Sequence, residues 1–100
     1  MEEDVKEFNE KLDLEMDPEL RVHDLISELG ELSKEILKTK DYGDSEYEVN
    51  EDIEDEFGDV YYCILSLAAE LGVDPEEALR SSLEKYRKRF EEKDSVGSGN

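Results

Sequence analysis

The chain has 100 residues, of which 36% are hydrophobic and 43% are charged, and its formal net charge is −19. This length suits one domain with a modest core, and the excess of acid argues against binding to nucleic acid or to an anionic membrane. No apolar run is long enough to span a bilayer, and the acidic N-terminus lacks the pattern of a signal peptide. The single cysteine, Cys63, lies in an apolar run and is predicted to be a buried structural thiol in a reducing compartment. We therefore expect a cytoplasmic protein without nucleic-acid or membrane partners.

The apolar residues of the first half recur with helical period, which predicts a folded, all-α protein. A short helix is expected over residues 3–14, and an Asp-Pro-Glu start signal then predicts a long helix over residues 18–39. Residues 41–50 are rich in Gly, Asp, Ser and Asn and predict a loop. In that loop, Tyr42 and Tyr47 could stack on a nucleobase, although tyrosines are common in loops.

Two further helices are predicted in the second half of the chain. Asn50 is a suitable N-cap for a helix over residues 51–71, which Gly72 would end. An Asp-Pro-Glu-Glu sequence then predicts the start of a last helix over residues 75–93. We therefore expect a small bundle of three main helices preceded by one short helix.

The middle helix indicates that a second chain takes part in the fold. Helix 51–71 carries apolar residues over more than half of its circumference and so needs neighbours on two sides. Three main helices supply few neighbours. We therefore expect a single domain over residues 1–93, with a flexible tail over 94–100, that is completed into a four-helix-type bundle by oligomerisation.

Two pairs of acidic residues, each spaced by three positions, are candidate metal ligands. Glu28 and Glu31 share one face of their helix, and Glu56 and Asp59 share one face of theirs. Antiparallel packing of the two helices would bring both pairs to one cleft and form an all-oxygen site that suits Mg²⁺. Since the chain contains 31 Asp and Glu residues, solvated helix faces explain the same spacing equally well.

Half of the 12 basic residues lie in the last predicted helix. Among them, Lys85 and Arg89 are four residues apart and share a face, where they could contact phosphate groups. Cations near the C-terminus of a helix are also favoured by the helix dipole alone. A basic pair and an acidic cage in one small bundle together suit a metal–polyphosphate ligand.

Four segments, taken in order, resemble the MazG-type nucleotide pyrophosphohydrolases. They are Ser27-Glu28-Leu29-Gly30-Glu31-Leu32, Asp55-Glu56-Phe57-Gly58-Asp59-Val60, the run from Gly72 to Arg80, and Lys85-Tyr86-Arg87-Lys88-Arg89-Phe90. Together they follow the family pattern of an ExxE motif, a spacer and an ExxD motif. The resemblance covers about residues 20–91.

The resemblance implies an all-α fold, usually dimeric or tetrameric, that hydrolyses nucleoside triphosphates to monophosphates and pyrophosphate, a reaction suited to nucleotide-pool cleaning. It implies that Mg²⁺, with Mn²⁺ as an alternative, is held by all four residues of the acidic pairs. Glu28 or Glu31 would act as general base, and Lys85 and Arg89 would contact the triphosphate. Similar proteins often carry Asn where this chain has Leu83, which affects any substrate contact made there.

Other functions remain open on the sequence alone. Phosphoribosyl-ATP pyrophosphohydrolases and dimeric dUTPase-like enzymes share the superfamily and its acidic pairs. From a different class, the charge of −19 would also suit a noncatalytic acidic adaptor or a DNA mimic. Such a protein would bind a basic partner and release no pyrophosphate.

Overall fold

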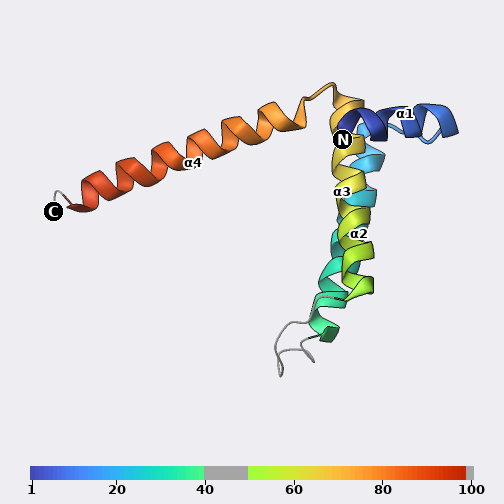
Figure 1. The fold of residues 1–100 in the computed structure, drawn as a ribbon, viewed down its shortest axis with the longest axis horizontal. Helices are drawn as coiled ribbons and strands as arrows, with labels where there is room; N and C mark the ends of the chain where they lie inside the picture. The colour runs from blue at the N-terminus through green and yellow to red at the C-terminus, as the bar shows by residue number, and fades with distance from the viewer. Residues whose placement is uncertain (40–49, 99–100) are drawn as a thin grey trace.

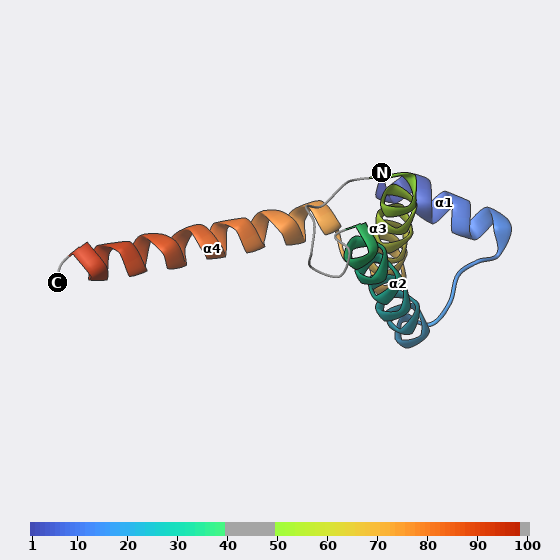
Figure 2. The same ribbon diagram turned by 90° about the horizontal axis from the view of Figure 1, so that it is seen from below.

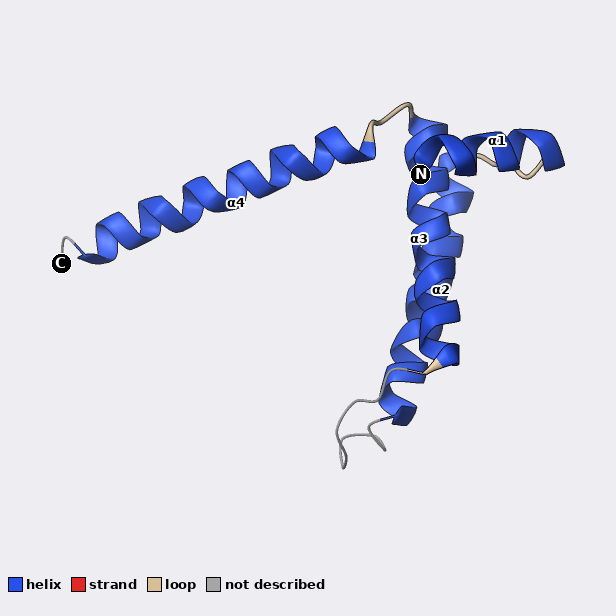
Figure 3. Ribbon diagram, in the orientation of Figure 1, coloured by secondary structure: helices blue, strands red, loops and turns tan. Residues whose placement is uncertain are grey.

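The computed structural model describes residues 1–39 and 50–98, with side chains through residue 93. The helices of this part are α1 (Glu2–Leu12), α2 (Pro18–Thr39), α3 (Glu51–Leu71) and α4 (Pro75–Ser98), without strands among the described residues (Figure 3). The all-α prediction is therefore confirmed. None of these helices is long and apolar enough to cross a membrane. Except for its last residue, the loop predicted over 41–50 lies outside the described residues, as do Tyr42 and Tyr47.

Local capping explains where α3 begins and ends and where α4 begins. The side-chain Oδ1 of Asn50 accepts a hydrogen bond from the backbone N–H of Ile53 at 2.9 Å, which satisfies a donor in the first turn of α3. α3 stops at Gly72, whose φ of 71° lies in the left-handed region that glycine adopts without strain. Asp74 caps α4 by accepting from the backbone N–H of Glu76 at 3.0 Å.

Two helix ends differ from the sequence-based expectation. α1 stops at Leu12 rather than at residue 14, because Asp13 adopts a left-handed conformation with φ of 56°. α4 continues to Ser98 rather than ending near residue 93. The apolar pattern ends at Phe90, but no proline follows to interrupt the helical backbone. Most of the segment predicted as a tail is therefore helical.

Helices α1, α2 and α3 pack together into one part of the molecule, here called the body, and α3 is its central helix. It packs along α2 and also against α1, which lies across the end of α3 that leads to α4 (Figures 1 and 2). Among the described residues, the buried apolar side chains all belong to α3: Val60, Cys63, Leu65 and Ala68. The thiol of Cys63 is free and buried, as predicted.

A buried polar network attaches α1 to α3. Asn9, only 3% exposed, donates from Nδ2 to the Oγ of Ser66 at 2.9 Å and accepts at Oδ1 from the hydroxyl of Tyr62 at 2.6 Å. Phe8 adds an edge-to-face contact with the ring of Tyr62. The position of α1 therefore depends on specific hydrogen bonds more than on apolar burial.

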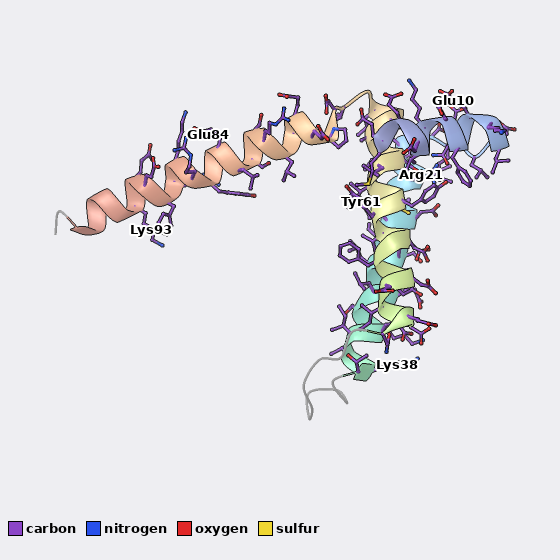
Figure 4. The ribbon with its side chains drawn as sticks, in the orientation of Figure 1. Glu10, Arg21, Lys38, Tyr61, Glu84 and Lys93 are labelled. Carbon is purple, nitrogen blue, oxygen red and sulfur yellow. The ribbon has the colours of Figure 1, made fainter. Side chains whose placement is uncertain are left out.

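A buried ion pair joins the start of α2 to the end of α3. Arg21 donates from Nε and Nη2 to the carboxylate of Glu70, with the closest contact at 2.8 Å. The same Nη2 donates to the backbone oxygen of Leu14, and the guanidinium lies 5.6 Å from the centre of the Tyr62 ring. Figure 4 shows Arg21 close to the place where α1 meets this helix pair.

α4 leaves this body and projects away from it (Figures 1 and 2). The radius of gyration is 17.9 Å, whereas a compact domain of 100 residues has about 13 Å. One consequence is a stripe of exposed apolar side chains on α4, here called the α4 stripe: Leu79, Leu83, Tyr86 and Phe90, each 57–69% exposed. A second exposed row on α3, here called the α3 outer row, contains Phe57, Tyr61, Ile64 and Leu71, each 40–62% exposed.

Candidate functional site

Three of the predicted acidic residues converge between α2 and α3. Glu28 projects from α2, and Glu56 and Asp59 project from α3, so that one carboxylate oxygen from each lies within 4.8 Å of the others. Glu28 and Glu56 are partly buried, whereas Asp59 is exposed. The side-by-side packing of the two helices therefore brings together residues that are 28 or more positions apart in the sequence.

The negative charges of this cluster are not balanced by a basic residue in the described part of the chain. Burial raises the pKa of Glu56, and the nearby carboxylates of Asp59 and Glu28 raise it further. Among the described residues, no salt bridge reaches any of the three. A cation bound between the carboxylates would relieve this repulsion, and an all-oxygen set of ligands suits a hard divalent ion such as Mg²⁺.

Glu31, the fourth predicted ligand, lies next to this cluster rather than within it. Its side chain is exposed, and it is not one of the three residues whose oxygens converge. Its charge nevertheless contributes to the raised pKa of Glu56, as does that of Glu35. Glu35 is partly buried and pairs with Lys38 at 3.4 Å. Glu35 therefore adds to the negative charge around Glu56, beyond the four residues of the two predicted pairs.

The predicted phosphate contacts, Lys85 and Arg89, lie on α4 and not beside the acidic cluster of the same chain. They help to line a shallow depression on α4 together with Arg80, Ser81, Glu84, Lys88 and Glu92. The ammonium of Lys85 lies 5.2 Å from the centre of the Tyr86 ring. In Figure 4 the labelled residues of α4, Glu84 and Lys93, lie well away from the α2–α3 pair.

Comparison with known protein families identifies the family of this chain. The sequence model of the MazG nucleotide pyrophosphohydrolase domain matches residues 16–93. This chain belongs to the MazG family. The resemblance inferred from its motifs is thus confirmed, and the match begins after α1. Comparisons with curated proteins and with solved structures gave no match.

Membership of the MazG family places the acidic cluster in a functional context. The matched segment contains all of α2 and α3 and most of α4, and with them every residue proposed for the site. MazG domains act on nucleotides as pyrophosphohydrolases, which requires that phosphate charge be neutralised. Converging carboxylates without a basic partner are a suitable place to hold a metal ion for that purpose.

The polar residues that hold α1 and the α2–α3 end together were not predicted from the sequence. One available signal was the position of Arg21, which lies four residues before Leu25 and so extends the apolar stripe of α2 by one turn. A basic residue on an apolar stripe requires a buried partner. The identity of that partner, Glu70, depends on tertiary packing.

Proposed function

We propose that this MazG protein hydrolyses nucleoside triphosphates between the α and β phosphates, releasing a nucleoside monophosphate and pyrophosphate, and that it serves to clean the nucleotide pool. The convergence of Glu28, Glu56 and Asp59 inside a chain of this family is the observation that carries the proposal. The metal we propose is Mg²⁺, with Mn²⁺ as an alternative.

The acidic residues have distinct proposed roles. Glu28, Glu56 and Asp59 would hold the metal through their converging oxygens, and Glu31 would complete the set of ligands from the adjacent turn of α2. When bound, Mg²⁺ supplies charge neutralisation for the phosphates and lowers the pKa of a coordinated water. Either Glu28 or Glu31 accepts a proton on its carboxylate from the attacking water.

The basic residues of α4 complete the proposed site. Arg89 can form paired hydrogen bonds with phosphate oxygens, and Lys85 provides a point charge. Both would stabilise the negative charge that develops on the departing pyrophosphate. Leu83, two residues before Lys85, offers no polar contact of its own, so that it affects substrate range rather than the chemistry of cleavage.

The direct test is to measure pyrophosphate release from a panel of ordinary and damaged (d)NTPs in the presence of Mg²⁺ or Mn²⁺. Release from one or more (d)NTPs, lost on chelation with EDTA, is the expected result. Including dUTP and phosphoribosyl-ATP in the panel separates the related specificities of the superfamily. A protein that releases pyrophosphate from none of these, yet binds a basic DNA-binding partner tightly, would be a noncatalytic adaptor or DNA mimic instead.

Glu56→Gln tests the site itself, because it removes one charged ligand and keeps the shape of the side chain. We expect kcat/KM to fall by more than about 100-fold, since loss of even an outer-shell partner of a metal ligand costs about 10- to 100-fold. Glu54→Gln, at an exposed acid outside the cluster on the same helix, is the matched control and should retain activity. Full activity of Glu56→Gln with Mg²⁺ would rule out the proposed metal site.

A further inference from the structure

The acidic cluster lies toward the end of the α2–α3 pair that is remote from α1. Glu56 and Asp59 belong to the second and third turns of α3, and the last turn of α2 lies at the same end of the pair (Figures 1 and 2). Figure 4 labels Lys38 in that last turn and Arg21 near the opposite end of α2. Lys38 therefore lies in the same part of the body as the candidate metal site, unlike the basic residues of α4.

The basic residues of α2 are Arg21, Lys34 and Lys38. Arg21 is buried in its ion pair with Glu70, whereas both lysines are exposed. By helical spacing, Lys38 lies about 80° round the helix from Glu28, and Lys34 lies about 120° from it. Lys38 is therefore the lysine of α2 that lies nearer to the face from which Glu28 projects.

The ammonium of Lys38 is held next to the acidic cluster by Glu35. Its Nζ lies 3.4 Å from Oε1 of Glu35, one turn back along α2. Long side chains on a helix point toward its N-terminus, which for Lys38 is the direction of the cluster. The charge of Glu35 contributes to the raised pKa of Glu56, so Glu35 lies within electrostatic reach of the cluster. One carboxylate thus separates the ammonium of Lys38 from Glu56.

The pair between Lys38 and Glu35 is well suited to exchange. The side chain of Lys38 is 51% exposed, and exposed ion pairs three positions apart on a helix are weak. A phosphate group carries more negative charge than a carboxylate and forms strong hydrogen bonds with an ammonium group. Glu35 keeps some contact with water, so its carboxylate is not left isolated when Lys38 moves. A phosphate bound nearby would therefore compete with Glu35 for Lys38.

We propose that Lys38 is a further substrate-binding residue. When a polyphosphate binds beside Glu28, Glu56 and Asp59, the ammonium of Lys38 leaves Glu35 and donates a hydrogen bond to a phosphate oxygen. The inference rests on the proposed function for the identity of the ligand. It adds a phosphate contact that comes from the same helix as Glu28 and does not depend on the basic residues of α4.

The position of Lys38 along α2 determines the class of ligand that it can contact. With a rise of about 1.5 Å per residue, Lys38 lies about 15 Å along the helix from Glu28 and about 10 Å from Glu31. Its side chain leans back over part of that length. A single phosphate at the cluster is too short to cover the rest, whereas a chain of two or three phosphates extends toward the ammonium. Lys38 therefore favours a triphosphate over a monophosphate.

Calorimetric titration of the full chain with inorganic tripolyphosphate, in the presence of Mg²⁺, tests the contact without depending on a nucleobase. Lys38→Ala is expected to raise the Kd about 10-fold, since a hydrogen bond between charged groups accounts for roughly that ratio of affinities. Lys38→Arg keeps the charge and should recover most of the affinity. The Kd for inorganic monophosphate should change little in either variant.

Lys34→Ala is the matched control, because it removes the same charge from the neighbouring turn of α2. A general effect of charge on the site would raise the Kd for tripolyphosphate equally in Lys34→Ala and Lys38→Ala, and that result would overturn the proposed contact. A specific contact predicts a much smaller change in Lys34→Ala.

Titration with Mg²⁺ alone distinguishes a phosphate contact from support of the metal ligands. Removal of a positive charge near carboxylates should leave Mg²⁺ binding unchanged or strengthen it. If Lys38 served only to orient Glu35 beside the cluster, Lys38→Ala would weaken the binding of Mg²⁺ itself. Weaker Mg²⁺ binding with an unchanged Kd for tripolyphosphate would therefore contradict the proposal.

A double-mutant cycle with Glu35→Gln completes the test. If Lys38 contacts phosphate directly, Lys38→Ala still raises the Kd for tripolyphosphate when residue 35 is already changed. If Lys38 acts only through Glu35, its effect disappears in the Glu35→Gln background, and the proposal fails.

The outcomes separate this inference from the proposed function. Pyrophosphate release from (d)NTPs, together with equal affinities of wild type and Lys38→Ala for tripolyphosphate, would retain the proposed function and overturn the role of Lys38. Binding of tripolyphosphate that depends on Lys38, in a protein that cleaves no nucleotide, would retain the contact and overturn the proposed function.

Discussion

The ion pair between Arg21 and Glu70 is the most buried ion pair among the described residues. Their side chains are 3% and 9% exposed, so both charges have lost most of their contact with water. The hydrogen bonds between them, together with those to Leu14 and Met16, offset that loss. The side-chain hydrogen bond from Arg21 to Glu70 raises the pKa of Arg21 above its usual value, so that the guanidinium remains charged.

Arg21→Met is expected to destabilise the protein strongly, because it leaves the carboxylate of Glu70 buried without a partner. Removing one member of a buried pair costs about 3–5 kcal/mol. The free energy of unfolding, measured by urea denaturation, is the appropriate readout. Arg87→Met is the matched control: its pairs with Glu84 and Glu91 are exposed, and their loss should change stability very little. Equal losses in the two variants would contradict this account of the pair.

At the residue scale, three of the four acidic residues predicted to share one cleft lie together in the structure. Glu28, Glu56 and Asp59 were singled out because of their spacing, and packing of α2 on α3 does bring their oxygens together. The same spacing rule placed Glu31 with them, but it lies beside the cluster. Helical periodicity gives the face on which a residue lies, whereas the distance between two faces depends on how the helices pack.

At the scale of single elements, capping residues and proline explain most of the boundaries of α2 and α3. The predicted spans 18–39 and 51–71 agree with the structure. Three of the four ends have a local signal, because Pro18, Asn50 and Gly72 each impose a backbone preference that tertiary packing did not override. The end of the last helix has no such residue and was predicted less well. α4 lacks a strong stop signal after Phe90, and it extends beyond its predicted end.

Asn50→Ala is expected to weaken the start of α3, since it removes the side-chain oxygen that accepts from Ile53. Loss of a cap of this kind costs about 1 kcal/mol. Thermal unfolding followed by circular dichroism would show a lower Tm. Ser33→Ala, at an exposed position inside α2, controls for the loss of a polar side chain and should cause no decrease, as alanine is the better helix former. An unchanged Tm for Asn50→Ala would mean that the cap contributes nothing.

At the scale of the whole molecule, the arrangement of the helices leaves a single chain with an incomplete core. The radius of gyration of 17.9 Å and the two exposed apolar rows follow from one feature, the projection of α4. The expectation of a homodimer or homotetramer, drawn from the apolar circumference of helix 51–71, remains a prediction. The exposed α3 outer row and α4 stripe supply the surfaces on which that prediction depends.

Leu83→Glu tests this assembly, because it places a charge in the middle of the α4 stripe. Burying that charge at an interface would be costly, so we expect the assembly to dissociate to monomers at micromolar concentration. Light scattering coupled to gel filtration gives the mass, and circular dichroism confirms that the helices persist. Ser81→Glu introduces the same charge at an exposed residue outside the α4 stripe and should leave the mass unchanged. A monomeric wild-type protein would contradict the prediction directly.

Helix positions, the all-α class, family membership and the candidate metal ligands could be inferred without coordinates, because each depends on neighbours within a few positions along the chain or on an ordered set of motifs. The partners of Arg21 and Asn9, the exclusion of Glu31 from the converging carboxylates, and the direction of α4 could not. Those features depend on contacts between helices that are far apart in the sequence, or on the geometry of a three-residue connection. The period of the apolar residues in the sequence indicates which face of a helix is apolar. The residues that this face contacts are decided by how the helices pack in the tertiary structure.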